Sequence, residues 1–253
     1  MGVANERSIA WGIARVLHEH GAKIAFTCQS DAFEKRLLPL AARIGSELVI
    51  PCDVEEAESQ KIVFNKLQQK WGLLDFIVHS LAYSDKDELN GRYVDTTLNN
   101  FIRTMHISCY SFTETARLAQ PLMAENGGSL ITLSYYGAER VMPSYNVMGV
   151  TKAALEASVR YLAADLGPDN IRVNALSAGP MRTLAGSAIG QARKIYNWSE
   201  ANAPLRRSVT LDQLGGAALY LLSELSSGVT GEIHHVDAGY NIVGLPYLTG
   251  NRN

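Results

Sequence analysis

Six short segments of the chain are apolar at consecutive positions, so neither face of a strand built from them would be polar. Segments of this kind, rich in β-branched and aromatic residues, are typical of strands buried on both faces of a parallel sheet. They read KIAFT (23–27), ELVIPCDV (47–54), DFIVHSLAY (75–83), GSLITLSYY (128–136), IRVNALSAGP (171–180) and GEIHHVDAG (231–239). We therefore predict at least six parallel strands.

Between these segments the apolar residues recur with helical spacing, as in SIAWGIARVLHEHG (8–21) and ESQKIVFNKLQQKWG (58–72). The first of these helices ends at Gly21, a suitable residue just past a helix C-terminus. Alternating strands and helices predict an α/β fold of the Rossmann type, a doubly wound parallel sheet between helices. No repeat or Pro/Gly-rich linker interrupts the chain, so we expect one domain over residues 1–253. In such folds ligands bind at the carboxyl ends of the strands.

The opening MGVANERSIAWGIA has the pattern of the turn and first helix of a βα unit without the strand that should precede them. In a dinucleotide-binding fold that strand lies in the middle of the sheet, and its loss would expose two strand edges. We therefore expect a truncated or misassigned start rather than a natural domain that lacks its central strand.

The amino-acid composition excludes several classes of protein. The 23 basic and 25 acidic residues are nearly balanced, which argues against a dedicated nucleic-acid-binding protein. The six histidines lack metal-ligand spacing, so no metal site is predicted. Three cysteines are too few for a disulfide framework, which favours a cytoplasmic protein. The sequence contains no signal peptide and no apolar run long enough to span a bilayer, so we expect no association with a membrane.

The first candidate binding residues are Gly2, Ser8 and Gly12, in a turn that does not match G-x-G-x-x-G. Ordinary turn chemistry explains such glycines equally well. A binding role is also possible in physical terms, because Gly2 permits close backbone approach and amides at the helix start near Ser8 can hold a pyrophosphate.

The next two strand ends carry polar residues suited to an adenosine. Gln29 and Ser30 can hydrogen-bond ribose hydroxyls, whereas Asp31 would repel a 2′-phosphate, so NADH is favoured over NADPH. Asp53 can accept a hydrogen bond from the adenine amino group, or it can cap the helix that follows. The sequence favours neither role for Asp53.

Tyr145 and Lys152 are the candidate catalytic pair. If a helix begins near Tyr145, a residue seven positions later lies about 20° from the same face and about 10 Å along the axis. Both side chains can then point into one cleft, where the ammonium group would lower the pKa of the phenol. The alternative is a half-buried tyrosine beside a lysine that only covers apolar surface.

These motifs together resemble those of the bacterial enoyl-acyl-carrier-protein reductases, a divergent branch of the short-chain dehydrogenases/reductases. The resemblance rests on SIAWGIA, SDKDELNGRYVDT, TLSYYGAERVMPSYNVMGVTKAALEASVRYLA, IRVNALSAGPMRTLA, PLRRSVT and SSGVTGEIHHVDAGY. Its most specific element is Tyr-x6-Lys, here Tyr145 and Lys152, with Tyr135 ten residues upstream. Ordinary short-chain dehydrogenases use Tyr-x3-Lys, and Gly149 occupies that lysine position here.

The resemblance implies NADH-dependent reduction of the trans-2 double bond of an enoyl thioester in fatty-acid elongation. Hydride would add to C3, the hydroxyl of Tyr145 would stabilise the enolate, and Lys152 would hold the nicotinamide ribose. Tyr135 is implied as a second active-site residue, and Tyr136 is expected to be structural. The substrate residues implied are Ser84, Tyr135 and Tyr145. The implied cofactor residues are Gly2, Ser8, Ile9, Gln29, Asp53, Val54, Leu81, Lys152, Met181, Arg182, Thr183, Leu184 and Ala185.

Residues 183–202 are expected to form a mobile flap over the acyl chain, with Leu184, Ile189, Ile195 and Trp198 as its apolar positions. Arg193 and Lys194 on this flap would meet an acidic acyl carrier protein, or would be a solvated pair. Arg206 and Arg207 are open to the same two interpretations. The family resemblance also implies a homotetramer, for which residues 244–248 would suit an interface.

Two other functions are compatible with the fold. A ketoreductase or sugar dehydrogenase of the same superfamily is disfavoured by the Tyr-x6-Lys spacing. A dinucleotide sensor without catalysis would have no reason to keep Tyr145, Lys152 and a flap together, although the missing first strand leaves open whether a cofactor binds.

Overall fold

The computed structural model describes residues 1–56, 58–187 and 191–245. Each of the six predicted segments overlaps a strand that is shorter than the apolar run that predicts it. The strands are β1 (Ala25–Cys28), β2 (Leu48–Pro51), β3 (Phe76–His79), β4 (Gly128–Ser134), β5 (Ile171–Ala178) and β6 (Ile233–Val236).

All strand pairs are parallel, as predicted, but in the described residues they form two sheets rather than one. One sheet pairs β1 with β2, and the other has the order β3-β4-β5-β6. Strands β1 and β3 both line a cavity of about 790 Å³, in the position where the sequence leads us to expect a central strand. Met1 borders this cavity and pairs with β3, since its amino group donates to the carbonyl of Val78 at 2.8 Å and its carbonyl accepts from the amide of Ser80 at 3.2 Å. Burial lowers the pKa of that amino group to about 6.

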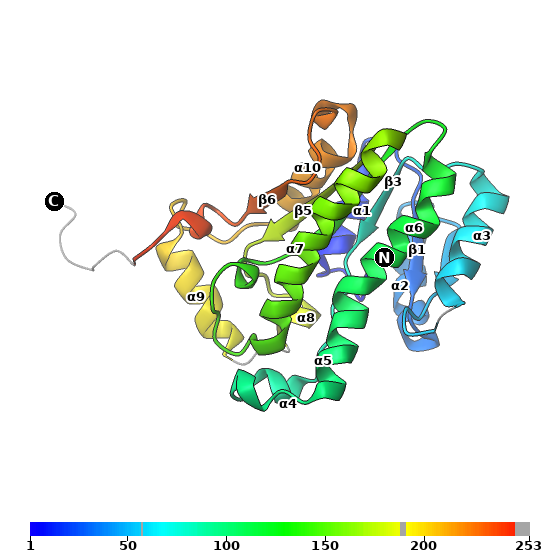
Figure 1. Cartoon of the computed structure of the whole chain (residues 1–253). Helices are drawn as coiled ribbons and strands as arrows, with labels where there is room; N and C mark the ends of the chain where they lie inside the picture. Colours follow the sequence, from blue (N-terminus) through cyan, green and yellow to red (C-terminus); the bar gives the residue numbers. More distant parts are fainter. Residues whose placement is uncertain (57, 188–190, 246–253) are drawn as a thin grey trace.

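The helices connect successive strands and cover both faces of the sheets (Figure 1). The α-helices are α1 (Ile9–Glu19), α2 (Asp31–Arg43), α3 (Ser59–Trp71), α4 (Lys86–Leu89), α5 (Leu98–Met105), α6 (Ser111–Met123), α7 (Asn146–Leu166), α8 (Leu184–Ser187), α9 (Ala192–Asn202) and α10 (Leu211–Leu222). A π-helical turn, η2 (His106–Tyr110), joins α5 to α6, and the 3-10 turns are η1 (Tyr93–Asp95), η3 (Tyr136–Ala138), η4 (Gly167–Asp169), η5 (Glu224–Ser226) and η6 (Tyr240–Ile242). Gly21 follows the end of α1 with φ +90°, which confirms its predicted place beyond the C-terminus.

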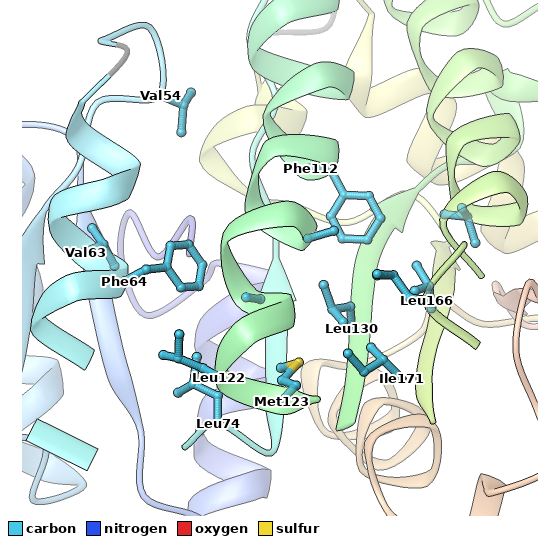
Figure 2. Close-up of a cluster of buried hydrophobic side chains, with 14 of the residues drawn as sticks. Val54, Val63, Phe64, Leu74, Phe112, Leu122, Met123, Leu130, Leu166 and Ile171 are labelled. Atoms are coloured by element: carbon cyan, nitrogen blue, oxygen red, sulfur yellow. The ribbon is translucent and has the colours of Figure 1, made fainter. Parts of the chain in front are cut away.

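The strand residues alternate between two apolar cores, which explains why the strands are apolar on both faces. Leu130 of β4 lies in a core with residues of α3, α6 and α7, including Phe64, Phe112 and Leu166 (Figure 2). Ile131, the next residue, packs on the opposite face with residues of α1 and α10. Because each strand is held between two helical layers, its carboxyl end is fixed, and the site described next lies there.

In the part of the chain that the structure describes, no helix is long and apolar enough to cross a membrane.

Candidate active site

The carboxyl ends of β1 to β5 open into one cavity of about 780 Å³. Of the sixteen residues implied as site residues, fourteen line it: Gly2, Ser8, Ile9, Gln29, Asp53, Val54, Leu81, Ser84, Tyr135, Tyr145, Lys152, Met181, Thr183 and Leu184. Arg182 is exposed and is not among the lining residues, and the side chain of Ala185 lies outside the described part of the structure. The structure thus brings together residues from every strand–helix connection that the sequence singles out.

Tyr145 stands at the N-terminus of α7, which begins at Asn146, and its side chain is 7% exposed. Its ring meets that of Tyr135 edge to face, with centroids 5.1 Å apart. The ring also packs on Gly137, where an added Cβ would lie 2.5 Å from Cδ1 of Tyr145. A Cβ on Gly149 would approach the carbonyl oxygen of Gly137 to 2.9 Å, so α7 lies too close to η3 for any larger residue at position 149 without a shift.

We predict that Gly137→Ala lowers turnover about 100-fold, because the new methyl group must displace the Tyr145 ring from its position. Gly216→Ala is the matched control, since Gly216 lies in α10 with no atom within 4 Å of an added Cβ. Steady-state rates of both variants test this prediction, and a Gly137→Ala enzyme as fast as the control would contradict it.

Lys152 lies on α7 and is 5% exposed. Its ammonium group donates a hydrogen bond to the carbonyl of Leu133, near the end of β4, at 2.7 Å. Burial lowers the pKa of Lys152 to about 8. A buried cation is costly unless a hydrogen bond or ligand uses its charge, and Lys152 is buried and hydrogen-bonded rather than reaching solvent along an apolar surface.

The expected lowering of the Tyr145 pKa is wrong. Burial raises the pKa of the Tyr145 phenol, and Tyr135 and Glu156 raise it further. The desolvation of the phenol therefore outweighs any effect of the lysine. The hydroxyl stays protonated at neutral pH and acts as a hydrogen-bond donor rather than as a phenolate.

The turn before α1 borders the cavity. Ser8 precedes α1, and its hydroxyl accepts from the amides of Ala4 and Asn5 at 3.0 and 3.1 Å, so it orders the turn instead of capping the helix. The first amides of a helix have no intrahelical acceptor, and those of α1 begin beside Ser8 and Ile9, which line the cavity. Gly2 has φ +96°, and an added Cβ would lie 2.0 Å from the carbonyl oxygen of Ser80. The close approach predicted at Gly2 is thus made to the backbone after β3.

Gln29 and Asp53 lie together at the far end, where the Gln29 amide donates to the Asp53 carboxylate at 3.2 Å. Asp53 also accepts from the amide of Glu55 at 3.0 Å, while α3 begins only at Ser59, so its suggested role as the cap of that helix is wrong. Asp31 is the first residue of α2 and does not line the cavity, so the acidic side chain near this end is Asp53 rather than Asp31.

Ser84, one of the residues expected to contact substrate, accepts a hydrogen bond from Asn100 Nδ2 at 3.2 Å. Tyr136 begins η3 and does not line the cavity. Its ring packs edge to face on that of Tyr240, which agrees with the structural role expected for it. An apolar wall of the cavity, formed by Leu89, Met142 and Met148, was not predicted from the sequence. The only sequence signal was the nearness of Met142 and Met148 to Tyr145, because Met residues carry no recognisable motif and Leu89 is far from Tyr145 in the sequence.

The predicted flap contains α8 and α9. Leu184 and Ile195 line the cavity, whereas Trp198 is 51% exposed and does not line it, and Ile189 lies outside the described residues. Tyr196 of α9 also lines the cavity. Arg193 and Lys194 are exposed on α9. Arg206, by contrast, donates to the carbonyls of Ala201 and Ala203, which indicates a structural role for that residue.

The residues present fit a nicotinamide dinucleotide. The cavity is lined from Asp53 to Tyr145, the N-terminus of α1 borders it at Ser8 and Ile9, and the buried Lys152 lines it together with the tyrosines. The charged residues that line it within the described part are Asp53, Asp85, Lys86 and Lys152, with no arginine among them, which suits a ribose without a 2′-phosphate. The described residues contain no group of three or more His, Cys, Asp or Glu arranged to hold a metal ion.

Comparison with known proteins agrees with this geometry. The family model described as Enoyl-(Acyl carrier protein) reductase matches residues 2–241. The chain is 59% identical over 252 residues to enoyl-[acyl-carrier-protein] reductase [NADH] 2 of Rhizobium meliloti, covering 100% of this chain and 94% of that one. It is 61% identical over 245 residues to reductase 1 of that species, covering 97% and 90% of the two chains. A crystal structure of the reductase from Anaplasma phagocytophilum in complex with NAD superposes with a TM-score of 0.94 at 60% identity, covering 98% of this chain and 94% of that chain. The chain belongs to the enoyl-(acyl carrier protein) reductase family.

Proposed function

We propose that this protein is an NADH-dependent enoyl-acyl-carrier-protein reductase that saturates the trans-2 double bond of enoyl thioesters in fatty-acid elongation. The observation that carries the proposal is the convergence of Tyr135, Tyr145 and Lys152 on one cavity with the helix N-terminus at Ser8 and the polar end at Asp53. NADH, when bound, supplies the hydride that adds to C3 of the enoyl chain.

In this proposal the chain's own residues do three things. The protonated hydroxyl of Tyr145 donates to the thioester oxygen as negative charge develops there, an electrostatic contribution of about 3–4 kcal/mol for one preorganised donor. Lys152 keeps its hydrogen bond to the Leu133 carbonyl and donates a second one to the nicotinamide ribose. The phosphates and the nicotinamide amide are held by Ser8, Ile9 and the segment from Met181 to Ala185. The adenosine is held by Gln29, Asp53 and Val54, and Leu81 lies along the cofactor.

The substrate would enter along the apolar wall, with Ser84 and Tyr135 beside its thioester and the α8–α9 flap over its acyl chain. A ketoreductase with Tyr-x3-Lys is disfavoured sterically, because residue 149 packs on the Gly137 carbonyl. NADH oxidation followed at 340 nm with crotonyl-CoA, with NADPH as the comparison, tests the proposal. Turnover with NADH supports it, and a folded chain that binds NADH without turnover would contradict it.

We predict that NADH affinity falls as the pH rises through about 8. The pKa of Lys152 is lowered to about 8 from 10.5, so the ammonium form is complete below pH 7 and is lost above pH 9. If the charged form clamps the ribose, the dissociation constant should rise up to tenfold per pH unit above the pKa. Fluorescence titrations from pH 6.5 to 9.5 measure this effect, and Lys152→Met should abolish it. A constant affinity over that range in the wild-type protein would count against the clamp.

The acyl carrier protein is the proposed partner, and Arg193 and Lys194 on α9 are the proposed contacts, since both are exposed next to the cavity. We predict that Arg193→Glu/Lys194→Glu raises KM for an enoyl thioester on acyl carrier protein about tenfold, because rim charges guide association with an acidic protein. KM for crotonyl-CoA should change little. Lys66→Glu on α3, also exposed, is the control, and equal effects of the two variants would exclude a docking role for α9.

The homotetramer also remains a proposal. Exposed apolar side chains on α5 and α7, such as Leu98 (74%), Ile102 (58%) and Tyr161 (76%), would be covered by partner subunits. Most of the interface segment suggested at 244–248 lies outside the described residues. Light scattering on the purified protein measures the assembly directly.

A further inference from the structure

A buried carboxyl group, that of Glu156, lies on α7 one turn beyond Lys152. The Glu156 side chain is 7% exposed, and its Oε1 accepts a hydrogen bond from the hydroxyl of Ser134 at 2.5 Å. Ser134 is the last residue of β4 and is followed directly by Tyr135. This contact therefore joins α7 to the strand end from which an active-site tyrosine emerges.

Lys152 holds the same strand end. Residues four apart on a helix lie on one face, and Lys152 and Glu156 contact consecutive residues of β4, the first through the Leu133 carbonyl and the second through the Ser134 hydroxyl. The end of β4 is thus fixed at two adjacent points by one face of α7.

Other polar residues surround the hydrogen bond between Ser134 and Glu156. Ser134, Ser177 and His235 are in register on β4, β5 and β6, on the face that packs against α7. His235 is hydrogen-bonded to Glu139 at 2.8 Å. Burial raises the pKa of the Glu156 carboxyl, and the charged groups that act on it include Glu139, His235, Arg160 and Lys152. A buried carboxyl group is costly where an apolar residue would serve the packing, so its presence here calls for a role beyond packing.

We propose that Glu156 and Ser134 are positioning residues that fix the carboxyl end of β4, and through it the backbone of Tyr135 and the carbonyl that receives Lys152. The inference rests on the proposed function of Tyr135, Tyr145 and Lys152. Ser134 borders the cavity, but its hydroxyl is directed at Glu156, so neither side chain acts on the reacting atoms.

The test compares Ser134→Ala, Glu156→Ala, Glu156→Gln and the double alanine variant in steady-state assays with NADH and crotonyl-CoA. We expect kcat to fall about 10- to 100-fold in each single alanine variant, because the tyrosine shifts from its reactive position. KM for NADH should change by less than about threefold, since the residues proposed to bind the cofactor are intact. Glu156→Gln should keep most of the wild-type kcat, because its amide oxygen still accepts from Ser134. The double variant should be no slower than the slower single variant.

Ser129→Ala is the matched control. Ser129 is a buried serine at the other end of β4 whose hydroxyl donates to the Leu221 carbonyl at 2.9 Å, so its loss removes a similar hydrogen bond away from the site. A kcat within about twofold of wild type in Ser134→Ala would overturn the inference, as would equal losses in Ser134→Ala and Ser129→Ala. Ser134→Ala removes only one oxygen atom, so it decides the question even if Glu156→Ala does not fold. Inactive wild-type protein would instead refute the proposed function, so the two failures are distinguishable.

Discussion

Tyr145→Phe should lower kcat about 100- to 1,000-fold while NADH binding is retained. The change removes one hydroxyl donor from a ring that is held by Tyr135 and by the close approach of Gly137. Loss of one preorganised donor to a developing oxyanion has an effect of this size. The ring should keep its position in the variant, because its packing contacts do not involve the oxygen.

Steady-state rates with crotonyl-CoA and fluorescence titration with NADH measure the two quantities separately. Tyr136→Phe is the control, since Tyr136 is the adjacent tyrosine, packs on Tyr240 and does not line the cavity. A Tyr145→Phe enzyme that keeps more than a tenth of the wild-type kcat would show that another group stabilises the enolate.

Lys152→Ala should weaken NADH binding about 10- to 100-fold, because a hydrogen bond from a charged donor contributes about 1.5–3 kcal/mol. The fold should tolerate the change, since burial of this ammonium group is itself unfavourable, as the lowered pKa of Lys152 to about 8 indicates. Lys152→Met keeps the volume of the side chain and separates the loss of charge from the loss of packing. Both variants should bind NADH equally weakly, and NADH binding as tight as in the wild-type protein would exclude the ribose clamp.

Most of the fold could be predicted because strands that are buried on both faces have a recognisable sequence pattern. Leu130 and Ile131 point to opposite cores, and this two-sided burial produces the continuous apolar runs from which six strands were predicted. The division of the strands into two sheets, with a cavity lined by β1 and β3, was not predicted.

The site residues that belong to a motif with fixed spacing could be predicted from the sequence. The properties that depend on burial of a side chain could not. Tyr-x6-Lys placed Tyr145 and Lys152 in one cavity, as the structure confirms. The pKa of Tyr145 was predicted with the wrong sign, because spacing shows that a lysine is near but not that the phenol is desolvated. The contact between Ser134 and Glu156 was invisible in the sequence for a related reason, since the two residues are 22 positions apart and no motif joins them. Asp53 was left with two alternatives, and only the start of α3 at Ser59 showed that it is not the helix cap.

The most direct test of the proposed enoyl reduction is to find which carbon of the product receives the hydride of NADH. Wild-type protein is incubated with crotonyl-CoA and NADH deuterated at C4, and the saturated product is analysed by mass spectrometry and NMR. We expect one deuterium at C3 of the acyl chain, and a proton from solvent at C2. No saturated product, deuterium at another carbon, or reduction of a 3-ketoacyl thioester in preference to the enoyl thioester would contradict the account.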